Sequence, residues 1–175
     1  YRCLNSLARQ DAALSLDYVA GDLSAFKPVE DDQVLYNDVT VSRPGGSSAR
    51  AVDSTGPLST QAPPDGVGTY NRPFTTNVST DEVLADHASW RLHEGTVDEP
   101  RFPAIGIELG RDTFTTDPAL TLAAMRLDIG ERVVVTNPKS GVGAPDDVQQ
   151  LVHGLAVTLT RFTCQITMLG VPEAP

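Results

Sequence analysis

Three histidines are the residues best suited to acid–base or metal chemistry, and their spacing argues against both. His87 and His93 lie six residues apart in a segment that we expect to be helical, so their side chains point in different directions. Glu94 follows His93, but the second histidine of the HExxH zinc pattern is absent. We therefore expect His87 and His93 to be solvated helix residues and His153 to be a strand residue.

Carboxylates, glycines and serines could form three other kinds of site, namely a cation or glycosidase site, a phosphate-binding loop and a nucleophile elbow. The acidic clusters at 30–32 and 146–147 could bind a hard cation or serve a glycosidase, whose two carboxyl groups must lie about 5 to 10 Å apart. The GxG pairs at 66–68 and 141–143 lack the strand–turn–helix frame of a phosphate-binding loop, and no GxSxG nucleophile elbow occurs. We expect solvated loop charge and turn glycines, with no catalytic residue, no metal and no cofactor.

Charge, cysteine content and hydropathy narrow the class of protein. The chain of 175 residues carries a net charge of −10, which argues against stable binding to nucleic acid. It contains no apolar run long enough to span a membrane and no signal peptide within the given residues, so we expect it to be soluble as given. Because it begins at Tyr1, we expect a trimmed chain, a processed product or one piece of a longer chain. Cys3 and Cys164 could form one bridge, but two small half-buried residues are the expectation.

The first half of the chain predicts short strands joined by turns. Alternating apolar residues indicate a hairpin of 14–19 with 23–26 and a second hairpin of 34–41 with 49–52. Seven glycines and prolines in 53–73 exclude a regular element there. We interpret this stretch either as a mobile surface loop or as an interaction arm.

Two helices and four further strands are predicted downstream. The capping box from Ser79 to Glu82 predicts a helix that starts there, with Trp90 as its core anchor and Gly95 as its stop. Asp117 should cap a short helix over 118–125. The strands are expected over 101–109, packed on the first helix, over 133–136, and in an antiparallel pair formed by 150–160 and 162–171.

These elements predict an α+β fold of mostly antiparallel strands, with one amphipathic helix and one short helix. No internal repeat is evident. We expect hairpins and the amphipathic helix in residues 1–112, and a short helix with a three-strand meander in residues 113–175. The two parts could be one interlocked domain.

Six stretches occur in an order that resembles the tail-tip hub proteins of siphophages, a group that includes minor tail proteins of actinobacterial phages. The stretches are NDVTVSR at 37–43, ARAVD at 49–53 followed by Gly56, DEVLADHASW at 81–90, EPRFP at 99–103, LDIGERVVV at 127–135 and LVHGL at 151–155. The resemblance covers roughly residues 28 to 172. The proline-rich stretch 56–73 departs from it, since the hub pattern has a short link there.

The resemblance implies a structural role without catalysis. Residues 128–135 and 150–169 would belong to a hub β-barrel or sandwich, and the chain would assemble as a homotrimeric ring with pseudo-sixfold character at the distal end of the tail tube. Its other partners would be the distal tail protein, the tail tube and a tail fibre or spike. The location implied is the virion, after assembly in the cytoplasm of the bacterial host.

Two other function classes stay open on the sequence alone. One is a monomeric ligand- or carbohydrate-binding β module, although only ten aromatic residues are available to stack on sugars. The other is a tail-associated hydrolase domain, which would need carboxylates or histidines that converge in a pocket.

Overall fold

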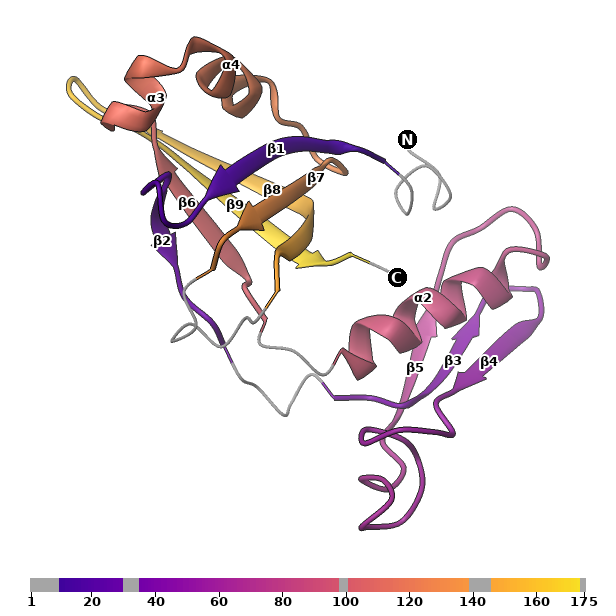
Figure 1. The fold of residues 1–175 in the computed structure, drawn as a ribbon. Coiled ribbons are helices and arrows are strands. Elements are labelled where there is room, and N and C mark those ends of the chain that lie inside the picture. Colours follow the sequence, from indigo (N-terminus) through magenta and orange to yellow (C-terminus); the bar gives the residue numbers. More distant parts are fainter. Residues whose placement is uncertain (1–9, 30–34, 98–100, 139–145, 174–175) are drawn as a thin grey trace. The chain divides into compact units, whose positions relative to one another are not determined.

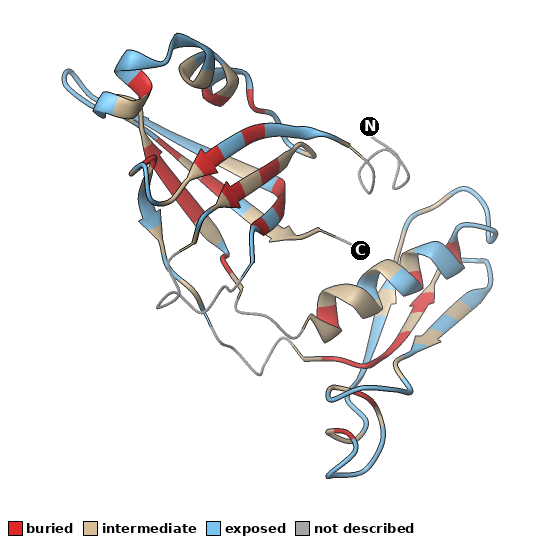
Figure 2. Ribbon diagram, viewed as in Figure 1, coloured by how far each residue is buried: buried red, intermediate tan, exposed pale blue. Residues whose placement is uncertain are grey.

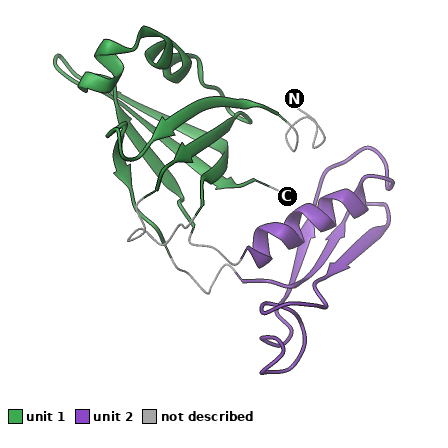
Figure 3. Ribbon diagram, viewed as in Figure 1, with its two compact units in different colours: residues 1–30, 99–173, 175 green, residues 31–98, 174 purple. Residues whose placement is uncertain are grey.

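The structure is a computed structural model, and it describes residues 10–29, 35–97, 101–138 and 146–173. These residues form two compact units, which Figure 3 distinguishes by colour. The six-stranded unit combines residues 10–29 with 101–138 and 146–173, and the three-stranded unit consists of residues 35–97. The second unit is therefore an insertion in the first. This grouping differs from the division into 1–112 and 113–175 expected from the sequence, because the N-terminal strands pair with strands far along the chain.

A curled sheet of order β1-β7-β8-β9-β6-β2 is the body of the six-stranded unit (Figure 1). All neighbouring strands are antiparallel except β1 and β7, which are parallel. The strands are β1 Ala12–Asp17, β2 Leu23–Phe26, β6 Ala104–Glu108, β7 Arg132–Thr136, β8 Val148–Leu159 and β9 Cys164–Pro172. The predicted antiparallel pair at the C-terminal end, now β8 and β9, is confirmed.

The two strands at the edges of this sheet follow each other in sequence. A turn over 18–22 joins β1 to β2, and the N–H of Asp17 donates to the Asp22 carboxylate at 2.7 Å. The Arg111 guanidinium holds the same turn by donating to the carbonyl oxygens of Gly21 and Leu23, at 2.7 and 2.8 Å. The predicted hairpin of 14–19 with 23–26 is wrong, because β1 and β2 do not pair with each other. They are the two edge strands of the sheet, and β1 pairs with β7 whereas β2 pairs with β6.

Apolar side chains form the core of this unit, and Figure 2 marks in red the ribbon segments whose residues are buried. Two helices, α3 (Asp112–Thr116) and α4 (Pro118–Arg126), contribute Phe114 and Ala124 to this core. Asp117 caps α4 by accepting from two backbone N–H groups, which confirms the predicted cap. The remaining buried members are Leu14, Leu16, Phe102, Ile105, Ile107, Leu127, Val133, Val135, Val148, Val152, Ile166 and Met168.

The strand predicted over 101–109 is β6, and its neighbours are in the six-stranded unit. It lies between β2 and β9, and Ile105 and Ile107 point into the core of that unit. The expectation that this strand packs on the amphipathic helix is therefore wrong. The strands that pair with β6 are distant in sequence and contribute residues 23–26 and 165–169.

The three-stranded unit is a β4-β3-β5 sheet covered on one face by a helix. Its elements are β3 Asp38–Ser42, β4 Ser48–Val52, β5 Asn71–Thr75 and α2 Leu84–Thr96. The antiparallel pairing of β3 with β4 confirms the second predicted hairpin. β5 runs parallel to β3 and begins at Asn71, so the exclusion of a regular element from 53–73 is wrong for its last three residues. Pro73 is tolerated there because one side of the backbone of an edge strand needs no partner.

The helix α2 begins five residues after the predicted capping box at Ser79. Asp81, which should have lain in its first turn, accepts a hydrogen bond from Arg43 Nε at 2.7 Å and another from the N–H of Ser47 at 3.3 Å. These partners lie on the turn between β3 and β4. The predicted start is therefore wrong, because an ion pair distant in sequence uses the residue that local patterning assigned to the helix.

Leu84 and Ala88, rather than Trp90, anchor α2 in the core of the unit. Trp90 is only half-buried, so its predicted role as core anchor is wrong. Gly95 lies inside the helix and is buried against Tyr36, where a Cβ atom would overlap the Tyr36 backbone oxygen and ring. This glycine thus permits close packing instead of ending the helix.

The described elements confirm an α+β fold dominated by antiparallel strands. Three described helices are present where two were expected, the additional one being the five-residue α3. None of the helices in the described part of the chain has the length and apolar composition needed to cross a membrane.

Candidate interaction surfaces

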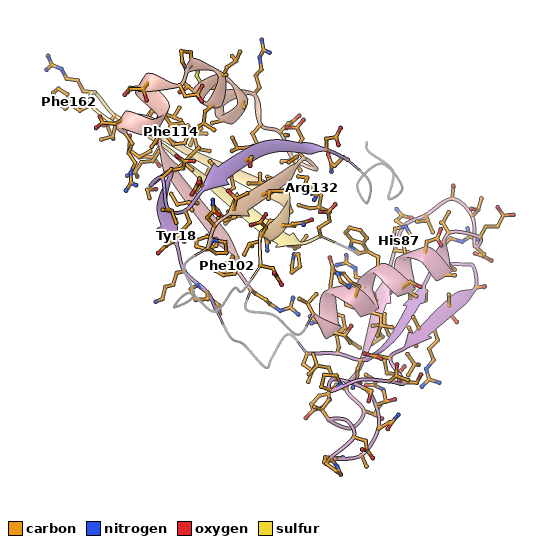
Figure 4. All side chains as sticks on the ribbon, in the orientation of Figure 1. Tyr18, His87, Phe102, Phe114, Arg132 and Phe162 are labelled. Carbon is orange, nitrogen blue, oxygen red and sulfur yellow. The ribbon has the colours of Figure 1, made fainter. Side chains whose placement is uncertain are left out.

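The residues suited to acid–base or metal chemistry do not converge. His87 lies half-buried on α2, where Figure 4 labels it, and His93 is also half-buried on that helix; His153 is an exposed residue of β8. Within residues 10–29, 35–97, 101–138 and 146–173, no three His, Cys, Asp or Glu side chains are grouped as metal ligands would be. The histidine positions thus agree with the helix and strand assignments, but two of the three are less solvated than expected.

The other residues singled out in the sequence fall in loops or outside the described residues. Asp146 and Asp147 are exposed just before β8, whereas the cluster at 30–32 and the GxG pair at 141–143 lie outside the described residues. Gly66 and Gly68 lie in a loop without a following helix, as turn glycines would. Cys164 is a free, half-buried thiol, and Cys3 is not among the described residues.

A polar surface covers the face of the three-stranded sheet opposite α2. A depression of about 430 Å³ on it is lined by Asp38, Thr40, Arg50, Asn71, Arg72 and Pro73. Arg50 donates two hydrogen bonds to the Asp38 carboxylate, at 2.7 and 2.8 Å, and this bonding lowers the pKa of Asp38. The Asp38 side chain is nearly buried while Arg50 is exposed. Asp38 and Arg50 are thus paired with each other, while the guanidinium carbon of Arg72 lies 5.0 Å from the centre of the Tyr36 ring, so the depression presents no converging acid and base.

The proline- and glycine-rich stretch is an ordered loop anchored by one buried amide. Asn37 is fully buried, and its Nδ2 donates to the carbonyl oxygens of Leu58 and Gly68, at 2.8 and 2.7 Å. Its Oδ1 accepts from the N–H of Tyr70 at 2.8 Å. Further bonds cross the loop, including Gly68 N–H to the Gln61 carbonyl at 2.8 Å. A buried side chain with three satisfied bonds fixes the loop on the end of β3.

The end of the β8–β9 hairpin exposes apolar side chains. Val157 is 64% exposed, Leu159 is 76% exposed and Phe162 is 85% exposed. Figure 4 shows Phe162 at the far tip of the hairpin, beyond α3. Residues 154–159 of β8 pair with β9 on one side, and on the other side no described strand pairs with them. An unpaired strand edge with an apolar face is a typical protein-binding surface.

A second apolar patch lies on the outer side of α4 and on the turn that follows this helix. Leu122, Met125 and Ile129 are 46%, 67% and 57% exposed, while Ala124 and Leu127 are buried on the opposite side. Leu122 and Met125 are three residues apart, so they share one face of the helix. Neither patch was predicted from the sequence. The available signal was the run from 148 to 172, which contains Arg161 but no carboxylate in a chain with 23 of them.

No protein-family profile matches the sequence, and a search of curated proteins finds no relative. Among solved structures, the fold is similar to the tail protein from Neisseria meningitidis MC58, with a TM-score of 0.50 and 17% sequence identity, over 95% of this chain and 44% of that protein. It is also similar to the 43 kDa tail protein of prophage MuSo2 from Shewanella oneidensis, with a TM-score of 0.49 and 14% identity, over 96% of this chain and 46% of that protein. The chain thus spans less than half of each of these proteins. At such identities the likeness is one of fold.

Proposed function

We propose that this chain is a structural component of a phage tail, and that it assembles as a homotrimeric hub ring at the distal end of the tail tube. The observation that carries the proposal is the fold likeness to the Neisseria meningitidis tail protein, which extends over 95% of this chain. The resemblance of six sequence stretches to siphophage hub proteins supports the same role independently. Because the chain spans less than half of that tail protein, its partners are part of the proposal.

The role is assembly rather than catalysis. It is supported by the scattered histidines, by the Asp38–Arg50 ion pair in the depression on the three-stranded unit, and by two apolar patches exposed on the six-stranded unit. Exposed apolar area of this kind is stabilising when a neighbouring subunit covers it. The partners we expect are further copies of the chain, the distal tail protein, the tail tube, and a tail fibre or spike.

Solution mass tests the ring. Light scattering over a concentration series should give a trimer, or a multiple of it, that dissociates on dilution. A strict monomer at the highest attainable concentration would contradict the ring and would favour a monomeric binding module, which a glycan screen would then test.

The location in the tail needs a separate measurement. Gold-labelled antibodies raised against the three-stranded unit should mark one end of the tail in electron micrographs of phage particles that encode this chain. Labelling of capsids, or of no particle at all, would contradict a tail role even if the chain were a trimer.

A further inference from the structure

We propose that the tip of the β8–β9 hairpin in one copy of this chain docks on the outer face of α4 in the next copy. The inference rests on the proposed ring and assigns the two surfaces that would form it. Both surfaces belong to the six-stranded unit.

Hydrogen bonds within the turn at the hairpin tip hold the backbone that carries Phe162. The Thr160 and Thr163 hydroxyl groups lie 2.6 Å apart, and Thr160 Oγ1 also accepts from the N–H groups of Phe162 and Thr163, at 3.3 and 3.0 Å. The Arg161 guanidinium lies 5.4 Å from the Phe162 ring. Aromatic and arginine side chains dominate the binding energy of protein interfaces, and a fixed turn lowers the entropy lost when they bind.

The apolar surface continues from the tip along β8. Val157 and Leu159 are paired with Ile166 and Cys164 of β9, so they share the face that lines the core farther along the sheet. At this end of the sheet the face is no longer covered, and both side chains are largely exposed. The hairpin therefore offers a strip of aliphatic surface that ends in Phe162.

The outer face of α4 is complementary to the hairpin in apolar surface and in charge. Leu122 and Met125 of the helix and Ile129 of the turn that follows it provide an exposed apolar strip. The charged residues along this segment are Asp117, Arg126, Asp128 and Glu131, which sum to −2. The hairpin carries the single charge of Arg161 and no carboxylate between positions 148 and 172. The two surfaces are thus apolar at the centre and opposite in charge at the rim.

The distribution of charge indicates that the partner docked on α4 is a second copy of this chain. Two molecules of net charge −10 repel each other on average, so a contact between copies needs a region that lacks negative charge. The β8–β9 hairpin is such a region. A hairpin-to-hairpin contact would bring two Arg161 side chains together, whereas hairpin on α4 pairs unlike surfaces, and a contact between two different surfaces can close into a ring.

Two variants test the hairpin surface and the α4 surface one at a time. Phe162→Asp disables the hairpin and Met125→Asp disables the helix; both side chains are largely exposed, so both variants should keep the unfolding temperature of the wild type. Val19→Asp is the matched control, since Val19 is exposed on the turn after β1. By sedimentation velocity, each of the first two variants should raise the dissociation constant of the assembly by about 30-fold or more, and the control should leave it unchanged.

Mixing the two disabled variants provides the decisive readout. The intact hairpin of Met125→Asp should dock on the intact α4 of Phe162→Asp, so the mixture should form dimers and no larger species. A mixture that stays monomeric would contradict a contact between two different surfaces. If the wild type assembles and neither variant weakens the assembly, the two proposed contact surfaces are contradicted but the ring is not. If the wild type itself is monomeric, both the ring and the contact surfaces are contradicted.

Discussion

The two units of the chain are stabilised by different means. Among the described residues, the core of the six-stranded unit contains fourteen buried apolar side chains, and that of the three-stranded unit contains five. The smaller unit adds polar ties, namely the buried amide of Asn37, the Asp38–Arg50 ion pair and the Asp81–Arg43 ion pair. A small sheet buries too little apolar area to fix a long loop, so hydrogen bonds hold it in place.

The difference extends to what each unit exposes. The six-stranded unit leaves apolar side chains uncovered on β8, at the hairpin tip and on α4, whereas the depression on the three-stranded sheet is lined mainly by polar and charged side chains, of which Asp38 and Arg50 form an ion pair. A unit with a large core tolerates exposed apolar patches without losing its fold. We infer that assembly uses the six-stranded unit, and that the three-stranded unit can be altered with less effect on it.

The largest expected effect is in the apolar core. Phe114→Ala removes a ring that is buried on α3, and it should lower the free energy of unfolding of the six-stranded unit by about 4 kcal/mol. Phe114→Leu is the control, with an expected loss of about 1 kcal/mol. Hydrogen exchange should report the loss in β6 and β9 and leave β3 unchanged. Equal loss of protection in β3 would mean that the two units unfold together.

Asn37→Ala should be nearly as severe, although it removes only a few atoms. It leaves two carbonyl groups and one N–H of the loop without partners, which should lower the free energy of unfolding of the three-stranded unit by about 3 kcal/mol. Trp90, the only tryptophan, lies on α2, so its fluorescence during denaturation reports on this unit. Asn71→Ala, at an exposed asparagine, is the matched control and should have little effect.

Gly95→Ala tests whether close packing or local helix preference decides the stability of α2. Replacing an exposed helical glycine with alanine is stabilising by about 1 kcal/mol. At Gly95 the added methyl group would overlap Tyr36, so we expect a destabilisation of about 2 kcal/mol. The measurement is the midpoint of the Trp90 fluorescence transition, with the exposed Ser89→Ala as control. A gain in stability would refute the close contact.

Asp38→Asn should give a smaller effect that depends on pH. Hydrogen bonds from Arg50 lower the pKa of Asp38 in the folded state, so the ion pair stabilises the fold above the ordinary carboxyl pKa of about 4, and this contribution is lost as the pH falls through the lowered value. The wild type should therefore lose stability on acidification more steeply than the variant. At neutral pH the variant should be the less stable of the two.

Asp81→Asn provides the comparison for Asp38. The pKa of Asp81 is lowered in the same direction by Arg43, but the Asp81 side chain is 43% exposed where that of Asp38 is 9% exposed, so its contribution should be the smallest of the set. Equal pH dependence in the two variants would mean that burial of Asp38 is unimportant.

The elements that could be predicted from the sequence are those set by local chemistry. Alternating apolar residues and a glycine turn were sufficient for the β3–β4 hairpin, and the same pattern identified β8 with β9. Asp117 followed by a proline was sufficient for the start of α4. In each case the partners belong to the same helix start or to consecutive strands, at most 22 positions apart for Gln150 and Pro172, so local preference and the final fold agree.

The features that could not be predicted from the sequence depend on residues that are far apart along the chain. The Arg43 side chain engages Asp81 and displaces the start of α2, and β1 and β2 separate to different neighbours despite the turn between them. The exposed patches at Phe162 and Met125 could not be located, because alternation in β8 and helical spacing in α4 do not indicate which side chains other elements will cover.

The insertion of one unit into the other also has a kinetic consequence. β3 pairs with β4 across at most fourteen residues, whereas Ala12 of β1 pairs with Arg132 of β7, 120 positions later. Closing so long a loop is entropically costly, and contacts between distant residues form slowly. During synthesis, β1 must therefore wait until β7 has left the ribosome, while the β3–β4 hairpin can form much earlier. The inserted unit would then shorten the effective length of the loop that the six-stranded sheet has to close.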